Sequence, residues 1–299
     1  MVTKDISQRF ILEKSNIRGE LTRLQKSYQQ VISNGDYSPV IEHLLGELMA
    51  AAVLLSSTLK FKGQLSIQAS GNGYLKMIMA ECRNDKKIKA IAKVSSSLPA
   101  PETSTNLKQL LGNGQLVITI QPDKGERYQG IVPLESGSLS KCIENYFKRS
   151  EQVPTRLFLF CQNGRTGGML LQTLPTQNHA AGFVEDPVAD NWNRACLLAE
   201  TLTNEELLAM SCERILHRLY NGDDVRLFDE KKVEFHCHCS LERVQQAFLS
   251  LPHDELQKLL NGHGALSAHC EFCNTPYEIE KKDLENKASF ATAKISALH

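Results

Sequence analysis

Four cysteines in the last quarter of the chain have the spacing of metal ligands. Cys237 and Cys239 form a Cys-x-Cys pair, and after thirty intervening residues Cys270 and Cys273 form a Cys-x-x-Cys pair. Zn²⁺ prefers four ligands in a tetrahedron, and each short-spaced pair can supply two thiolates from one turn. We therefore predict that these cysteines bind one structural Zn²⁺ per chain. The protein would fill every ligand position, so no position stays open for water, and this argues against catalytic zinc.

Other interpretations of these four cysteines stay open. One thiolate could be replaced by a neighbouring histidine, namely His236, His238 or His269. The cysteines could also be small buried hydrophobic residues whose spacing is a coincidence. Disulfides in the resting protein are disfavoured, because the polar start at residues 1–5 has no apolar signal segment after it and nothing else predicts export. We therefore expect a cytoplasmic protein.

The size of the unit around the pairs makes the metal energetically important. A unit of about 60 residues has a core that supports only a few kcal/mol of stability, whereas a structural Zn²⁺ contributes roughly 10–16 kcal/mol of apparent binding free energy. Removing Zn²⁺ is therefore expected to unfold the unit, and oxidants could do the same by removing the thiolates. A permanently closed structural site is the alternative, and the spacing alone favours it over a switch.

The other five cysteines are scattered along the chain. We predict that they are small packing residues: Cys82, Cys142, Cys161, Cys196 and Cys212. Cys142, for example, lies on the apolar face of a helix expected over residues 138–149. A functional role for these five residues has no support in the sequence.

The elements before the cysteine pairs predict a mixed domain. Residues 8–24 alternate apolar and polar positions as in strands, and residues 38–60 have apolar positions at helical spacing after Pro39. Turn residues separate three pairs of short strands, and this is typical of antiparallel hairpins. The pairs are residues 64–69 with 74–80, 116–120 with 127–132, and 157–161 with 169–173. Residues 1–176 are therefore predicted to form one α+β domain of antiparallel sheet and helices.

Residues 177–224 are expected to form a helical linker. Its first helix carries an apolar stripe, and a second helix over residues 207–219 is predicted to open at a cap around Thr203. The stripe, which we expect to pack on the N-terminal domain, consists of Trp192, Ala195, Leu198, Ala199 and Leu202. An ordinary helix face in a permanent core is the alternative. The small zinc domain is expected over residues 225–286, with a tail over residues 287–299.

Composition narrows the classes of function. The chain has 299 residues, with 34 basic and 34 acidic side chains, and this zero balance argues against a protein that mainly coats nucleic acid or an acidic membrane. The longest apolar run, residues 48–55, is too short to span a membrane. Nucleotide-binding and hydrolase motifs are absent, so we expect no enzyme. The lysines at 86, 87, 89 and 93 are interpreted as a solvated strand edge rather than a basic binding patch.

Beyond the cysteines, several stretches resemble the redox-regulated heat-shock holdase family, also called the 33 kDa chaperonin. Asp-Val-Arg-Leu-Phe at residues 224–228 and the segment 233–244 resemble the start of that family's zinc domain, and Cys270–Cys273 with Tyr277 resembles its second ligand pair. Further matches are Gly-Ile-Val-Pro-Leu at 130–134, Tyr-Phe-Lys-Arg-Ser-Glu-Gln-Val-Pro-Thr at 146–155 and Gly-Gly-Met-Leu-Leu-Gln at 167–172. They appear in the family's order over residues 60–280. Asn221-Gly222 departs from its usual acidic residue, at the linker end and away from the ligands.

The resemblance implies an ATP-independent holdase that is inactive when reduced and zinc-bound. Oxidation would form two disulfides between sequence neighbours, Cys237–Cys239 and Cys270–Cys273, release zinc and unfold the C-terminal domain with the linker. The active form, commonly a dimer in this family, would then bind unfolding client proteins. The linker stripe is our candidate for the apolar surface that is exposed, since a disordered segment can wrap varied clients.

Two other functions compete with the holdase on the sequence. A zinc module that binds nucleic acid or the ribosome is the runner-up, but residues 231–286 hold six basic and nine acidic side chains, and that excess of negative charge opposes phosphate binding. A thiol–disulfide oxidoreductase has the Cys-x-x-Cys motif in its favour. It would need that motif to open a helix in a βαβ context, which the sequence does not predict.

Overall fold

The structure is a computed structural model that describes residues 4–59, 62–99, 104–174, 187–262 and 265–280, together with 282 and 284. The chain forms two compact units that divide between His236 and Cys237. The predicted α+β class is confirmed, whereas the domain limits drawn from the sequence stay predictions. The predicted tail and the first part of the predicted linker, residues 177–186, lie outside the described residues.

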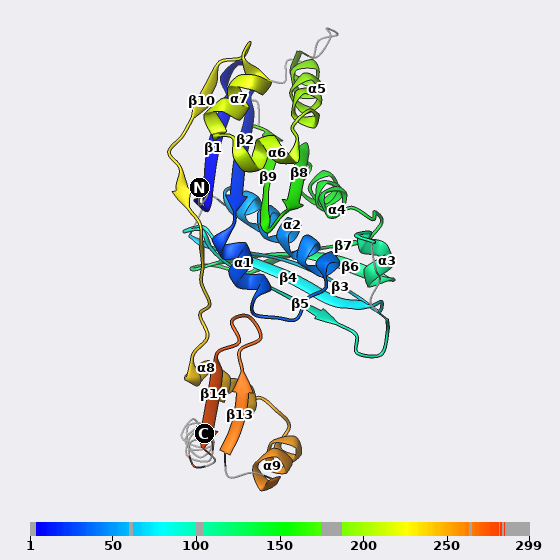
Figure 1. The fold of residues 1–299 in the computed structure, drawn as a ribbon, viewed down its shortest axis with the longest axis vertical. Coiled ribbons are helices and arrows are strands. Elements are labelled where there is room, and N and C mark those ends of the chain that lie inside the picture. Colours follow the sequence, from blue (N-terminus) through cyan, green and yellow to red (C-terminus); the bar gives the residue numbers. More distant parts are fainter. Residues whose placement is uncertain are drawn as a thin grey trace. The chain divides into compact units, whose positions relative to one another are not determined.

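The first unit contains two six-stranded sheets (Figure 1). The first sheet has the order β10-β1-β2-β9-β8, and β11 also pairs with β1. Its strands are β1 (Ile6–Leu12), β2 (Ile17–Leu24), β8 (Thr155–Gln162), β9 (Arg165–Thr173), β10 (Val225–Leu227) and β11 (Lys231–Lys232). Asn163 and Gly164, both with positive φ, form the two-residue turn between β8 and β9, as the predicted hairpin requires.

The second sheet has the order β12-β5-β4-β3-β6-β7. It is antiparallel except for the pairing of β12 with β5, which is parallel. Its strands are β3 (Gly63–Gly71), β4 (Leu75–Arg83), β5 (Lys87–Val94), β6 (Gly114–Pro122), β7 (Tyr128–Pro133) and β12 (Glu234–Phe235). The two other predicted hairpins are thereby confirmed as β3 with β4 and β6 with β7.

Helix α2 (Pro39–Ser56) lies between the two sheets and contacts strands of both (Figure 1). It begins with Pro39 at its first turn, where the missing N–H costs no hydrogen bond. It is long and apolar enough to cross a membrane, with a mean hydropathy of 1.5, but 78% of it is buried inside the protein. Its apolar character is therefore accounted for by the core that it fills.

Shorter helices complete the core around α2. They are α1 (Lys26–Ile32), α3 (Leu107–Leu111) and α4 (Leu139–Tyr146), with a 3₁₀ turn at Glu13–Ser15 and a π-helical turn at Phe147–Glu151 that extends α4. The Asp5 carboxylate accepts hydrogen bonds from the backbone N–H groups that open α1, with N···O distances of 2.6–3.1 Å. The N-terminal strand is thereby tied to the first helix.

The helices after β9 are α5 (Pro187–Glu200), α6 (Asn204–Ala209) and α7 (Cys212–Tyr220), and they pack on β1, β2 and β9 in a second apolar cluster. The predicted cap at Thr203 is confirmed as a capping box with Glu206. The single helix predicted over residues 207–219 is wrong. Met210 is extended with ψ 155°, and the Ser211 side chain caps a new helix by accepting the N–H of Arg214.

Lys86 contradicts the predicted solvated lysine edge, because its side chain is only 2% exposed. Its ammonium lies 3.5 Å from Glu20 Oε1 and donates to the Val53 carbonyl and the Ser56 hydroxyl. Burial lowers the pKa of Lys86, while the charge of Glu20 opposes that shift. Lysines are rarely buried without such a partner, and Glu20, 66 residues away, gave no local signal in the sequence.

The second unit is small. It has one hairpin, β13 (Ala265–His269) with β14 (Pro276–Glu280), and two helices, α8 (Leu241–Leu249) and α9 (His253–Gly262). The buried apolar side chains of its described part are Leu256, Leu266, Ile279 and Leu284. That cluster is far smaller than either cluster of the first unit.

Candidate metal centre

The four cysteines lie in two turns of the second unit, one before α8 and one between β13 and β14. Cys237 and Cys239 follow β12 and precede α8. Ser240, the residue after Cys239, is the N-cap of that helix. The Ser240 hydroxyl accepts the N–H of Arg243, and the Arg243 guanidinium donates to the His238 carbonyl at 2.9 Å. This turn is therefore held by its own capping residues.

Cys270 and Cys273 occupy the turn between β13 and β14. The N–H of Cys270 donates to the Thr275 carbonyl at 2.9 Å, and that of Asn274 donates to the Cys270 carbonyl at 2.7 Å. Asn274 has a φ of 55°, a left-handed conformation that asparagine tolerates better than most residues. The hairpin thus presents both sulfurs on one side of a tight turn.

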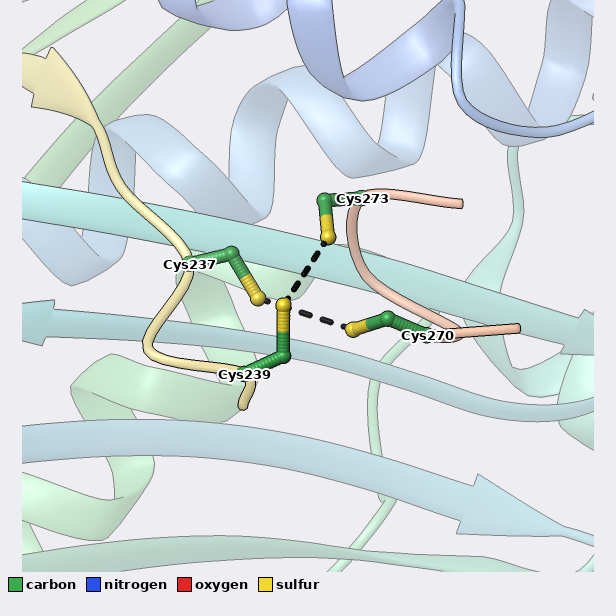
Figure 2. A group of neighbouring side chains, drawn as sticks. All are labelled: Cys237, Cys239, Cys270 and Cys273. Atoms are coloured by element: carbon green, nitrogen blue, oxygen red, sulfur yellow. Dashed lines mark hydrogen bonds between the residues drawn. The ribbon is translucent and has the colours of Figure 1, made fainter. Parts of the chain in front are cut away.

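The two turns bring the four sulfur atoms together (Figure 2). All four lie within 4.8 Å of one another, with 3.6 Å between the Sγ atoms of Cys237 and Cys270 and 3.3 Å between those of Cys239 and Cys273. Four thiolates about 2.3 Å from one tetrahedral Zn²⁺ would have sulfurs about 3.8 Å apart. The donor set and its spacing therefore fit a single zinc ion.

The thiols of the cluster differ in the direction of their pKa shifts. Burial raises the pKa of Cys237 and of Cys270. At Cys273 burial acts in the same direction, but hydrogen bonds, above all with Thr275 at 3.1 Å, outweigh it and lower its pKa to about 7. Cys273 therefore loses its proton more readily than Cys237 or Cys270, and the thiolate is the form that binds metals.

The same geometry bears on the alternative in which a histidine replaces one of the four cysteine ligands. In the part of the chain that the structure describes, the group of ligand atoms within 4.8 Å consists of the four cysteine sulfurs and includes no histidine. His236, His238 and His269 do not belong to that group. The assignment of the four cysteines as zinc ligands itself remains a prediction that this geometry supports.

Two polar residues lie beside the cluster, of which sequence reasoning named Tyr277 only as part of a family-like stretch and missed Thr275. Thr275 contacts Cys273 through its hydroxyl, and a side-chain hydrogen bond with Cys239 raises the pKa of Tyr277 to about 12. Both belong to the Asn-Thr-Pro-Tyr run directly after the second pair. Polar side chains within four residues of a ligand pair were the available signal, since residues around a metal commonly orient its ligands.

The predicted linker stripe lies in the first unit. Ala195 and Ala199 are fully buried, Leu202 is 5% exposed, and Trp192 and Leu198 pack partly buried against the same cluster. Tyr220 at the end of α7 donates its hydroxyl to the Ala195 carbonyl at 3.0 Å. The stripe therefore packs on the first sheet, as expected, and is covered in this state.

The five scattered cysteines are all buried, as predicted for packing residues. Burial raises the pKa of Cys82, Cys161 and Cys196 to about 11. A thiol with so high a pKa holds little thiolate at neutral pH and reacts slowly with oxidants. The two sets of cysteines thus differ in exposure, and the clustered set has four sulfurs within 4.8 Å of one another.

Comparisons with known proteins agree with one another. The model of the Hsp33 protein family matches residues 5–280. A 33 kDa chaperonin from Hahella chejuensis is 43% identical over 282 residues, covering 94% of this chain and 96% of the relative. One from Shewanella oneidensis is 40% identical over 292 residues, covering 98% of each chain. The crystal structure of a 33 kDa chaperonin from Thermotoga maritima matches with a TM-score of 0.80 at 18% identity, covering 97% of this chain and all of that one.

Proposed function

The chain belongs to the Hsp33 family of chaperonins, and we propose that it is an ATP-independent holdase controlled by oxidation of its four clustered cysteines. The reduced, zinc-bound protein would be inactive, and the oxidised protein would bind unfolding clients and prevent their aggregation. One observation carries this proposal. The unit that holds the cysteines has a very small core, whereas an apolar linker stripe lies covered on the other unit.

A bound metal would cross-link the second unit through the four sulfurs. Bound Zn²⁺ would hold Cys237, Cys239, Cys270 and Cys273 as thiolates and tie the two turns of the second unit to each other. The described apolar cluster of that unit is too small to replace this tie. Loss of the ligands would therefore unfold the unit.

Peroxide chemistry can remove the ligands in balanced steps. One thiol of a pair attacks H₂O₂, its sulfur gains an oxygen as sulfenic acid, and one water leaves. The second thiol of the pair then attacks that sulfur, a disulfide forms and a second water leaves. Two H₂O₂ would thus oxidise four thiols to two disulfides, which we expect to be Cys237–Cys239 and Cys270–Cys273. Neither bond joins one turn to the other.

Unfolding of the second unit would then weaken the docking of the linker. The stripe residues Ala195, Ala199 and Leu202 would leave their apolar contacts on the first sheet. Exposed apolar surface on the linker and on the sheet could hold apolar segments of clients. We place this activity in the cytoplasm, with a homodimer as the oxidised form and without nucleic acid as the main partner.

The test is the aggregation of a thermally unfolding client in the presence of the full-length protein. We expect peroxide-treated protein to suppress aggregation and reduced protein with one zinc per chain to do so far less. Zinc release and the loss of four thiols should accompany activation. Equal suppression by the reduced and the oxidised protein would contradict the proposed switch.

A further inference from the structure

Residues 224–236, which we call the strap, cover two sheet edges at once (Figure 1). The strap contains β10 and β11, which pair antiparallel with β1, and β12, which pairs parallel with β5. Without the strap, β1 would be the edge of the first sheet and β5 the edge of the second. Open strand edges are templates for pairing with another chain.

Backbone hydrogen bonds hold the strap on the β1 edge. The N–H of Phe228 donates to the Arg9 carbonyl and that of Val233 to the Asp5 carbonyl, both at 2.9 Å. The pairing shifts by one residue between the two strands of the strap, from Phe10 opposite Leu227 to Ile6 opposite Lys232. The chain that pairs with the β1 edge therefore carries one extra residue between β10 and β11, and the edge tolerates it.

The same kind of bond holds the strap on the β5 side. The N–H of Glu234 donates to the Lys86 carbonyl at 3.1 Å, and that of His236 donates to the Ile88 carbonyl at 3.0 Å. Bonds between backbones carry no information about the side chains of the occupant. A chain of different sequence could make them equally well.

Few side chains of the strap are anchored. Val233, 2% exposed, is its one buried residue, while Val225, Leu227 and Phe235 are partly buried against the apolar clusters. The ion pairs of Arg226 with Glu13 and of Glu230 with Lys4 are exposed and therefore contribute little. A few apolar side chains thus anchor the strap, and its other positions could be occupied by many different residues.

The strap is also joined directly to the cysteine cluster, because His236 precedes Cys237 in the chain. If the second unit unfolds, the end of the strap at β12 loses its folded neighbour. β12 is only two residues long and β11 likewise, so little pairing resists fraying from that end. Release of the strap would uncover β1 and β5 when the switch operates.

We propose that, in the oxidised protein, an extended segment of the client replaces the strap and pairs with the β1 and β5 edges. This inference rests on the proposed holdase function and names its client-binding surface. The client chemistry is an unfolded segment of about a dozen residues with free backbone N–H and C=O groups and apolar side chains at a few alternate positions. Unfolding proteins of any sequence class supply such segments.

The geometry favours a client over a second copy of this chain. A two-fold symmetric pairing of β1 with its own copy would be antiparallel and would cover one edge only. The strap instead runs antiparallel along β1 and then parallel along β5 in one continuous chain. One extended client segment can repeat that path, whereas a symmetric dimer contact cannot.

The first experiment uses a synthetic peptide of residues 224–236, which contains no cysteine, as a competitor in the client aggregation assay with peroxide-treated full-length protein. Its matched control carries N-methyl groups on the backbone nitrogens of Phe228, Val233 and His236, which removes three donors and keeps every side chain. We expect excess plain peptide to reduce client suppression severalfold and the methylated peptide to leave it unchanged.

The other possible results of the peptide experiment each contradict a different part of the proposal. If neither peptide, or both equally, reduces the suppression by active oxidised protein, the edge-pairing proposal is wrong and the holdase remains. If the plain peptide converts oxidised dimers to monomers without loss of client suppression, the edges bind a second copy instead. If oxidised protein never suppresses aggregation, the proposed function itself fails.

Hydrogen exchange at Glu13 gives a second readout, because its N–H donates to the Asp224 carbonyl of the strap at 3.0 Å. We expect a protected amide in the reduced protein, exchange at least about tenfold faster in the oxidised protein alone, and renewed protection when client is bound. Fast exchange that persists in the client complex would overturn pairing at β1.

Discussion

The two units of this protein are stabilised by different means. The first unit, up to His236, fills the space between two sheets with α2 and has a second apolar cluster beneath α5, α6 and α7. The second unit, from Cys237 onward, has four buried apolar side chains in its described part and four cysteine sulfurs within 4.8 Å. The difference teaches that one chain can contain a part with a large apolar core beside a part with a small core and a cluster of four cysteines, whose folding we propose to depend on a bound metal.

The cysteines follow the same division. Those of the first unit are buried and have raised pKa values, whereas those of the second are half-buried and adjoin one another. A buried thiol in the first unit contributes packing and is protected from oxidants. Under the proposed function, the clustered thiols of the second unit would contribute stability through the metal that they hold.

The largest effect is expected from Cys237→Ser, which removes one of four proposed ligands. Zinc content of the reduced protein should fall from one per chain towards zero, because a structural site contributes about 10–16 kcal/mol only when its ligand set is complete. Amides of β13 and β14 should lose their protection from hydrogen exchange. Those of α2 and β3 should keep theirs, since their cluster contains none of the four cysteines.

Cys142→Ser is the matched control. Cys142 is buried in the first unit, where its thiol donates to the Ser136 carbonyl at 3.3 Å, and a serine hydroxyl can replace that bond. Its zinc content should equal that of the unmodified protein. Full zinc content in Cys237→Ser would refute the ligand assignment, and loss of protection in α2 would refute the independence of the two units.

The next effect concerns the linker that lies on the first unit. In Ala199→Asp a carboxylate would replace a fully buried methyl group in the second apolar cluster, at a cost of about 3–5 kcal/mol. We expect the linker to undock, so that reduced protein with full zinc suppresses client aggregation. Trp192, the single tryptophan of the chain, should report the undocking by a red shift of its fluorescence.

Leu197→Asp is the control for that charge, since Leu197 lies on the same helix with 64% of its surface exposed. This variant should stay inactive when reduced, with unchanged Trp192 fluorescence. If Ala199→Asp shifts the fluorescence and yet remains inactive, exposure of the linker stripe is insufficient for client binding. The released strap would then be the remaining route by which client surface is uncovered.

A smaller effect is expected on the stability of the first unit at high pH. Burial raises the pKa of Cys82 from 9.0 to about 11, so the folded state favours the neutral thiol. Its contribution to stability is complete below pH 9 and is lost as the pH rises to about 11, by roughly 2–3 kcal/mol. The urea midpoint of the first unit should fall over that range, and it should fall less in Cys82→Ala. An equal fall in both proteins would refute this assignment.

Much of this architecture was predictable because its signals are local. Turn residues such as Asn163-Gly164 mark the hairpins, Pro39 marks the start of α2, and paired cysteines mark the cluster of four sulfurs. Each signal lies within a few residues of the feature that it predicts. The capping box at Thr203 was found for the same reason.

The features that escaped prediction depend on contacts between distant residues. The strap pairs with β1, whose residues precede it by more than two hundred positions, and its bonds come from backbone groups that every residue has. Lys86 looked like a surface lysine because its partner Glu20 is remote in sequence. The break at Met210 is set by a serine cap directly after it, which helical periodicity alone does not reveal.

The smallest effect tests the two means of stabilisation with one chemical change. Ile279 and Ile67 are both fully buried, the former in the small cluster of the second unit and the latter in the large cluster of the first. Removing one methylene as Ile→Val costs about 1 kcal/mol at either site. In Ile279→Val that loss should appear in zinc affinity, weakened about fivefold, because metal binding and folding of that unit are one equilibrium. In Ile67→Val zinc affinity should be unchanged, and the loss should appear in the urea midpoint of the first unit instead.

Competition with a chelator of known affinity measures the zinc affinity, and urea unfolding measures the midpoint of the first unit. If Ile279→Val binds zinc as tightly as the unmodified protein, the second unit is already folded without metal, and oxidation of the cysteines could not unfold it.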